Sequence, residues 1–202
     1  RQRQMCIRDR IMIVTPSNKL DAVNEILSAV GSSPVNSLED ELNVDVLNAV
    51  RILDSVSKEI QSRGWDFNIE DSVALLPDAD TNLVPCPNNY LRFVSSGYKL
   101  IRRSGYFFDI LSQTNEFPEG LTLDTLVRGL DFEELPEVFR KFITCRAARI
   151  FQMRYLTSDD LNTHLMTEES SAYADIIDYD LTTGNYNILN DDQYISQYIQ
   201  RS

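Results

Sequence analysis

The amino-acid sequence predicts an α+β fold, an α-helical bundle with an inserted small antiparallel β-sheet region. Within 15–65 and 131–184, apolar residues recur at the three- and four-residue spacing of amphipathic helices. Residues 66–130 hold short apolar runs between Pro, Asn, Ser and Gly turn signals, as small antiparallel sheets do. We therefore expect a leader (1–14) that is non-native or disordered in part, a helical bundle (15–65 and 131–184), an inserted β region (66–130) and a C-terminal tail (185–202).

The first ten residues differ in charge from the rest of the chain. The 202 residues include 19 Lys and Arg and 31 Asp and Glu, a net charge of -12. Residues 1–10 hold four Arg and one Asp, so subtracting their charge of +3 leaves -15 for the remaining 192 residues. Their lack of apolar periodicity and a first Met at position 5 predict translated cloning sequence. The alternative is a native basic arm that binds an acidic partner.

Composition indicates a globular chain. Hydrophobic residues make up 43% of it, and nine Tyr and nine Phe are more apolar anchors than a disordered chain carries. The longest N-terminal apolar run, 11–14, is far too short for a membrane anchor. Three cysteines with no C-x-x-C pair (Cys6, Cys86 and Cys145) favour neither a disulfide framework nor a zinc site. A reducing cytosol fits this cysteine content best.

Two helices are predicted in the first bundle segment. Ser17 is a suitable N-cap for a helix that ends at Gly31. Its apolar face comprises Leu20, Val23, Leu27 and Val30. Residues 37–40 resemble a capping box for a second helix that ends near Gly64. The apolar stripe of that helix has heptad spacing and comprises Leu42, Val46, Ala49, Leu53, Val56 and Ile60. It predicts a position in the core of one subunit, with a coiled-coil partner as the alternative.

The β region is predicted to begin with Trp65, Phe67 and Ile69, which alternate with polar residues as in a half-buried strand. Short apolar runs between turn signals then follow at 73–76, 90–94, 98–101, 106–111 and 121–130. The edges of the predicted sheet carry the basic residues Arg92, Lys99, Arg102 and Arg103.

A third helix is predicted to begin at 133–137, where acids and Pro136 favour a helix start. The predicted inward face comprises Phe139, Phe142, Ile143, Ala147, Ile150 and Met153. Residues 138–156 contain no acid and five bases, which are Arg140, Lys141, Arg146, Arg149 and Arg154. Ser158 can cap a last helix whose apolar face comprises Leu161, Leu165, Ala172 and Ile176. Residues 157–202 hold nine acids and one Arg, a net charge of -8, and we expect the polar tail to be extended until something binds it.

Few residues suggest catalysis. His164, the single histidine, is predicted to lie on a solvated helix surface, and no motif indicates a Ser or Cys nucleophile. No phosphate-binding glycine loop is present, which disfavours nucleotide enzymology. We also expect no cofactor and no catalytic metal. The carboxylate pairs Glu133/Glu134, Glu168/Glu169 and Asp191/Asp192 allow a glycan hydrolase as an alternative. The simpler interpretation places the first pair at a helix N-terminus and the other two in a solvated acidic tail.

The five bases at 140–154 lie around the helix and do not form one stripe, which favours salt links to acids of neighbouring helices or subunits. A sequence-independent DNA binder is the other interpretation, and the acidic net charge opposes it.

In several segments, among them LDAVNEIL at 20–27 and IQSRGWDFNIE at 60–70, the chain resembles the tail tubular protein A family of short-tailed phages. The similarity begins with LDAVNEIL at 20–27, followed by Gly31 and Pro34, and continues with IQSRGWDFNIE at 60–70. Further similar segments, in the same order, are LLPD at 75–78 with Asn82 and Leu83, LPEVFR at 135–140, AARIFQMR at 147–154 and YNIL at 186–189. The Arg-Gly-Trp segment at 63–65 is the most specific of these, and residues 88–130 are the most divergent.

The resemblance implies a structural role without catalysis. It implies a dodecameric homo-oligomer ring, an adaptor or gatekeeper between the portal protein and a tail nozzle of the tubular protein B type. Such a ring would help to retain packaged DNA and would form part of the ejection channel, with DNA only as passing cargo. Tail fibres would dock near the junction of adaptor and nozzle. The expected location is the virion tail, after assembly in the host cytoplasm.

Complementary charge on the basic helix and the acidic tail suggests where subunits or partners meet. The candidate interface residues are Arg63, Trp65, Arg140, Arg149, Arg154, Asp191, Asp192 and Tyr194. For Arg63 and Trp65 there is a structural alternative, in which Trp65 fills the junction between bundle and sheet while Arg63 pairs with a nearby acid.

Overall fold

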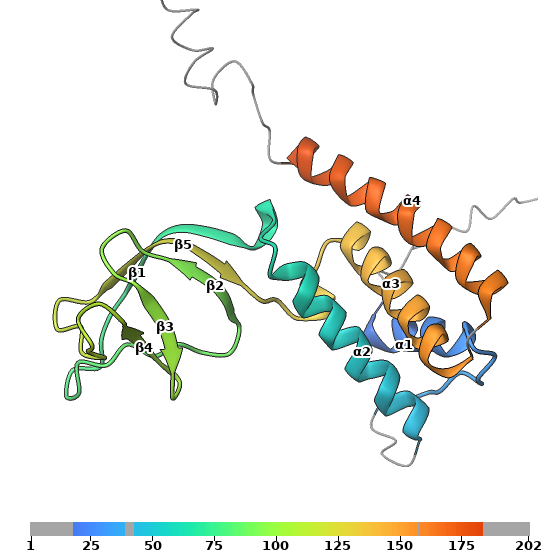
Figure 1. Ribbon diagram of the computed structural model, residues 1–202, viewed down its shortest axis with the longest axis horizontal. Helices are drawn as coiled ribbons and strands as arrows, with labels where there is room; N and C mark the ends of the chain where they lie inside the picture. Colours follow the sequence, from blue (N-terminus) through green and yellow to red (C-terminus); the bar gives the residue numbers. More distant parts are fainter. Residues whose placement is uncertain (1–17, 39–42, 157, 184–202) are drawn as a thin grey trace, which may run out of the picture.

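The computed structural model describes residues 18–38, 43–156 and 158–183, and it confirms the α+β class (Figure 1). Four helices lie at one end of an elongated molecule: α1 (Lys19–Ser28), α2 (Val44–Gln61), α3 (Glu137–Tyr155) and α4 (Asp159–Thr183). Five strands lie at the other end: β1 (Ile69–Leu75), β2 (Tyr90–Val94), β3 (Leu100–Arg103), β4 (Tyr106–Asp109) and β5 (Leu121–Arg128).

Helix α1 is fixed at both ends by local hydrogen bonds. The N-cap is Asn18, whose Oδ1 accepts from the Asp21 N–H at 2.8 Å, while the Asp21 carboxylate accepts from the Asn18 N–H at 3.3 Å. Ser17, the predicted cap, lies outside the described residues. At the other end Gly31 has φ +75°, and the N–H of Ser32 donates to the Leu27 carbonyl at 3.1 Å. This Schellman-type ending explains why the helix stops where the sequence predicted.

Helix α2 begins later than predicted. Its N-cap is Asn43, whose side chain accepts from the N–H groups of Asp45 and Val46. The predicted start at 37–40 is wrong, because Ser37 and Leu38 are not helical; residues 39–42 lie outside the described part. The heptad stripe is confirmed where it is described, since Val46, Ala49, Leu53, Val56 and Ile60 are all buried. It packs within the chain, against α1 and α3.

The predicted strand at 65–69 is wrong. Residues Asp66–Asn68 form a 3-10 turn, and β1 begins only at Ile69. The cause is the side chain of Asn68, which is buried: its Oδ1 accepts from the Trp65 N–H at 2.8 Å, and its Nδ2 donates to the Gln61 and Arg128 carbonyls. An amide that satisfies three backbone groups overrides the alternating pattern.

A second amide joins the same two parts of the fold. Gln61, at the end of α2, donates from Nε2 to the Leu130 carbonyl at 3.1 Å, and its Oε1 accepts from the Leu130 N–H at 2.7 Å. Gln61 is only 3% exposed, so water competes little for these bonds. The side chains of Gln61 and Asn68 thus hold the ends of α2, β1 and β5 together, where the helical and β parts meet.

The β part consists of two small sheets around their own core. Antiparallel strands in the order β1-β5-β2 form one sheet, and the hairpin β3-β4 forms the other. Phe107 of β4 is fully buried and packs edge-on against Phe93 of β2, with ring centroids 4.9 Å apart. The remaining buried residues of this core are Val84, Cys86, Phe117, Leu121, Leu123 and Leu126.

The helical part buries a separate core, and the predicted inward face of α3 is partly wrong. Phe139, Phe142, Ile143 and Ala147 are buried as predicted, but Met153 is 50% exposed. Phe151 and Gln152 are buried in its place. The last turns of α3 therefore present a different face from the one that periodicity suggested. On α4, Leu165, Ala172 and Ile176 are buried, while Leu161 is half-buried.

Gly31 and Gly64 allow a comparison of what it costs to replace glycine where the backbone φ angle is positive. Gly31 and Gly64 have positive φ values of +75° and +81°. A Cβ at Gly31 would meet nothing within 4 Å, whereas at Gly64 it would lie 2.5 Å from Arg92 Nη2, 3.2 Å from Val127 Cγ2 and 3.3 Å from Ile69 Cδ1. In urea unfolding we expect Gly31→Ala to cost about 1 kcal/mol and Gly64→Ala about 2 kcal/mol. Equal costs would show that Gly64 is not sterically required.

Candidate subunit interface

The basic residues of α3 are largely paired with acids inside the chain. Arg146 binds Glu59 of α2 at 2.9 Å and Glu169 of α4 at 3.0 Å. Arg149 binds the other carboxylate oxygen of Glu169 through its Nε. Lys141 lies 3.9 Å from Asp175 of α4. These pairs confirm the salt links to neighbouring helices that the sequence predicted, and they tie α3 to helices on both sides.

Glu169 is the centre of this network. Its residue surface is only 9% exposed, and its two carboxylate oxygens face the guanidinium groups of Arg146 and Arg149. The interpretation that placed Glu169 in a solvated acidic tail is therefore wrong. The spacing of Arg146 and Arg149, three residues apart and thus adjacent on one face of a helix, is the sequence signal that could have found the pair.

A pocket of about 350 Å³ opens beside these ion pairs, between α3, α4 and the end of α2. We call it the arginine pocket, and it is lined by Arg63, Phe142, Arg146, Arg149, Met166, Glu169, Ser170 and Tyr173. The rings of Phe142 and Tyr173 lie 5.6 Å apart in its wall. Met166 and Tyr173 are 57% and 40% exposed, so apolar surface surrounds the charged groups. Such a surface can bind a carboxylate together with an apolar side chain.

Arg63 and Trp65 are two positions apart in the sequence, but one is exposed and the other is buried. Trp65 is 7% exposed, packs edge-on against Phe139 at 5.0 Å, and donates from Nε1 to the Ile60 carbonyl at 2.8 Å. Arg63 is half exposed, lies 4.0 Å from Glu59 and lines the arginine pocket. This is the geometry of the structural alternative: Trp65 is a core residue where the two parts meet, and Arg63 is available at the surface.

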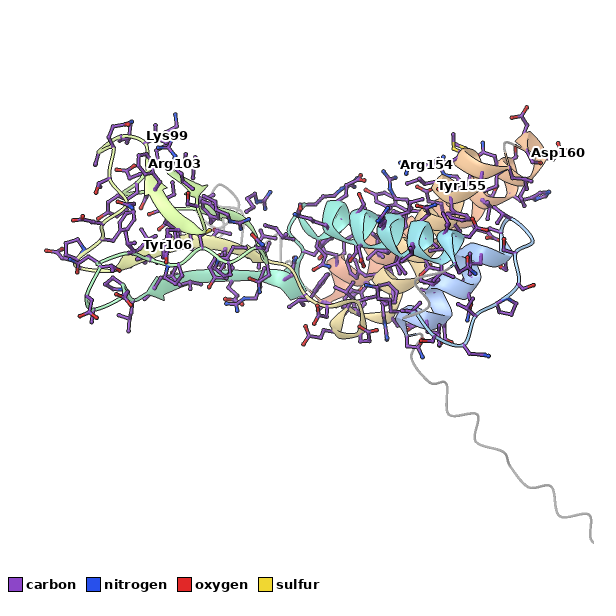
Figure 2. The ribbon with its side chains drawn as sticks, turned by 90° about the horizontal axis from the view of Figure 1, so that it is seen from below. Lys99, Arg103, Tyr106, Arg154, Tyr155 and Asp160 are labelled. Carbon is purple, nitrogen blue, oxygen red and sulfur yellow. The ribbon has the colours of Figure 1, made fainter. Side chains whose placement is uncertain are left out.

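The other candidate residues lie apart from one another. Arg140 is buried and pairs with Glu137 at 2.6 Å. Arg154 and Tyr155 project from the end of α3, near Asp160 of α4, at the opposite end of the molecule from Lys99, Arg103 and Tyr106 (Figure 2). The remaining three candidates, Asp191, Asp192 and Tyr194, lie outside the described residues.

A basic surface also occurs on the β3-β4 hairpin. The Arg103 guanidinium lies 3.9 Å from the centre of the Phe108 ring, a cation-π contact that holds the side chain against the strand. Lys99 precedes the other end of β3, while Arg102 donates to the Pro87 carbonyl at 2.7 Å. Of the bases predicted at the edges of the sheet, Arg102 and Arg103 thus make contacts within the chain.

An acidic surface lies on α1 and α4, which we call the acidic flank (Glu25, Glu168 and Asp175). All three residues are exposed. Partial desolvation raises the pKa of Glu25, the negative charge of Glu168 raises it further, and Lys141 opposes the rise. Lys141 also lies 3.9 Å from Asp175, so the three carboxylates of the flank share this lysine.

The thiol of Cys145, on α3 near this flank, gives a pH prediction. Burial, with the charges of Glu25 and Glu168, raises its pKa from 9.0 to about 11. Since the thiol of the unfolded chain ionises first, its contribution to stability is complete below pH 9 and is lost as the pH rises to about 11. Urea unfolding between these pH values should show a shallower decline for Cys145→Ala than for the unsubstituted protein. Identical declines would contradict this assignment.

The residues considered for catalysis are dispersed or already bound. His164 is exposed on α4. The Glu133 carboxylate accepts from the Lys19 N–H at 3.2 Å, and that of Glu134 accepts from the Asp131 N–H at 3.3 Å. Over 18–38, 43–156 and 158–183, no cluster of three His, Cys, Asp or Glu side chains is placed to hold a metal ion. None of the helices in these ranges combines the length and apolar character needed to cross a membrane.

Comparison with known proteins identifies the family. A family model described as Tail tubular protein matches residues 20–186. No curated protein matches the chain. The matched range includes all five strands and, apart from Lys19 at the start of α1, all four helices, together with every residue of the arginine pocket and the acidic flank. The chain therefore belongs to the tail tubular protein family, a family of structural, non-catalytic components of the phage tail.

Proposed function

We propose that this protein is the subunit of a head-to-tail adaptor ring. Copies of the chain would form a closed ring that joins the portal to the tail nozzle. The ring would help to retain packaged DNA and would form part of the channel through which DNA is ejected. In this role the protein acts by assembly in the host cytoplasm, not by catalytic turnover.

The observation that carries this proposal is the two-part architecture (Figure 1). The helices and the strands have separate hydrophobic cores and lie at opposite ends of an elongated subunit. Each end can therefore contact a different protein without disturbing the packing of the other. Two buried amides, those of Gln61 and Asn68, keep the ends in a fixed relation. An adaptor between two unlike assemblies needs both properties.

The charge of the chain is consistent with DNA as passing cargo. A net charge of -12 repels a polyanion, so a channel built from such subunits would let the duplex slide without sticking. Most bases of α3 are used in pairs within the chain and are not arranged to neutralise phosphates.

Electron microscopy of co-assembled proteins tests the proposal. The purified chain is mixed with portal complexes over a range of salt concentrations and imaged in negative stain, with portal alone as the control. We expect a ring of added density at one end of the portal. Absence of added density at every salt concentration would overturn the proposal.

A further inference from the structure

The arginine pocket has more positive than negative charge. Arg63, Arg146 and Arg149 line it, and the acids within reach are Glu59 and Glu169. The side chains of Arg146 and Arg149 are about one-quarter exposed, at 25% and 23%, and that of Arg63 is 47% exposed. The pocket thus keeps guanidinium donors at the surface of a chain whose overall charge is strongly negative.

The acidic flank lies on the other side of α4 from the arginine pocket. Met166 and Tyr173 face the pocket, and Glu168 and Asp175 each follow one of them by two residues. Two residues correspond to a rotation of about 200° around a helix, which places the acids on the opposite side. Leu165, Glu169, Ala172 and Ile176 lie between the two sides, buried against α3.

We infer that the arginine pocket receives the acidic flank of a second copy of this chain. This rests on the proposed function, and it assigns the contact that joins neighbouring subunits. Glu168 of one copy would approach Arg63 and Arg149 of the next, over the exposed apolar side chains of Met166 and Tyr173. The contact is heterologous, because each copy contributes a different surface to each junction.

A second copy fits the pocket better than an unrelated partner for two reasons. First, complementary surfaces of opposite charge lie on opposite sides of one helix pair, so that repetition of the contact leads from copy to copy and allows a ring to close. Second, the pocket sets three arginines against Glu59 and Glu169, while the flank sets three carboxylates against Lys141, and one contact would reduce both imbalances.

A charge-reversal experiment tests the inference. Arg63→Glu and Glu168→Arg are made separately, and assembly on purified portal complexes is measured by light scattering and electron microscopy. Each variant alone should lose at least tenfold in assembly, since every junction would bring like charges together. An equimolar mixture should recover assembly, because in an alternating ring the two reversed charges meet each other at one junction and the native residues meet at the next. Recovery would also show that both variants are folded.

Matched controls reverse exposed charges elsewhere. Arg51→Glu on α2 and Glu119→Lys in the β part should assemble as the unsubstituted protein does, alone and mixed. Normal assembly of Arg63→Glu and Glu168→Arg alone would overturn the inference and leave the proposed function standing. Loss that the mixture does not recover would assign the pocket to another protein and would also overturn it. Failure of the unsubstituted chain to assemble would overturn both.

Discussion

Glu169→Gln is expected to lower the free energy of unfolding by about 3 kcal/mol, because it leaves Arg146 and Arg149 facing each other with one carboxylate removed. The glutamine amide keeps the size of the side chain but not its charge. Glu59 remains as a partner for Arg146, which places the effect at the lower end of the range for buried ion pairs. Guanidinium chloride unfolding at neutral pH measures the effect.

The adjacent residue provides the control for this substitution. Glu168 is exposed on the acidic flank, so Glu168→Gln should change stability by less than about 0.5 kcal/mol. Similar losses for the two variants would mean that Glu169 is not the centre of the network, and that α3 and α4 are held together by their apolar contacts alone.

Phe139→Ala is expected to cost about 4 kcal/mol, the largest effect of a single truncation in the helical core. Phe139 is fully buried, and its ring lies 5.0 Å from Trp65, 4.6 Å from Phe67 and 6.0 Å from Tyr179. It therefore connects α3 with α4 and with the turn that leads into β1. Thermal and denaturant unfolding both measure the loss.

Two further measurements separate this effect from general destabilisation. Phe139→Leu retains most of the apolar volume and should cost only about 1.5 kcal/mol. The protein has one tryptophan, so native-state fluorescence of Phe139→Ala reports on Trp65 directly and should shift to longer wavelength. An unshifted spectrum with full stability would show that the aromatic cluster does not join the two parts.

The presence of four helices, the core stripe of α2 and the approximate positions of most short strands could be predicted from the sequence, because periodicity and turn residues are local properties. Two of the failures, the early start of β1 and the solvated placing of Glu169, have a common cause, which is a polar side chain with a distant partner. Asn68 bonds to Arg128 and prevents an early start of β1, and Glu169 is buried only because α3 brings two arginines to it. The spacing of Arg146 and Arg149 shows that they are adjacent on one face of α3, but it does not show which acid lies against them.

The candidate interface shows the same limit. Arg63 and Arg149 could be chosen from their charge, and both line the arginine pocket. Trp65 is equally prominent in the sequence, yet its burial and its bond to the Ile60 carbonyl give it a role in the core. Arg146, which completes the pocket, stands out in the sequence only as one of five bases, since its partners Glu59 and Glu169 lie 87 and 23 residues away.

Cryo-electron microscopy of the assembled tail, still attached to its portal, tests the adaptor role most directly. We predict a closed ring of this α+β fold between portal and nozzle, with adjacent subunits in contact through opposite sides of the α3-α4 pair. Density for the chain at another level of the tail, or as isolated copies without ring contacts, would contradict the proposed function.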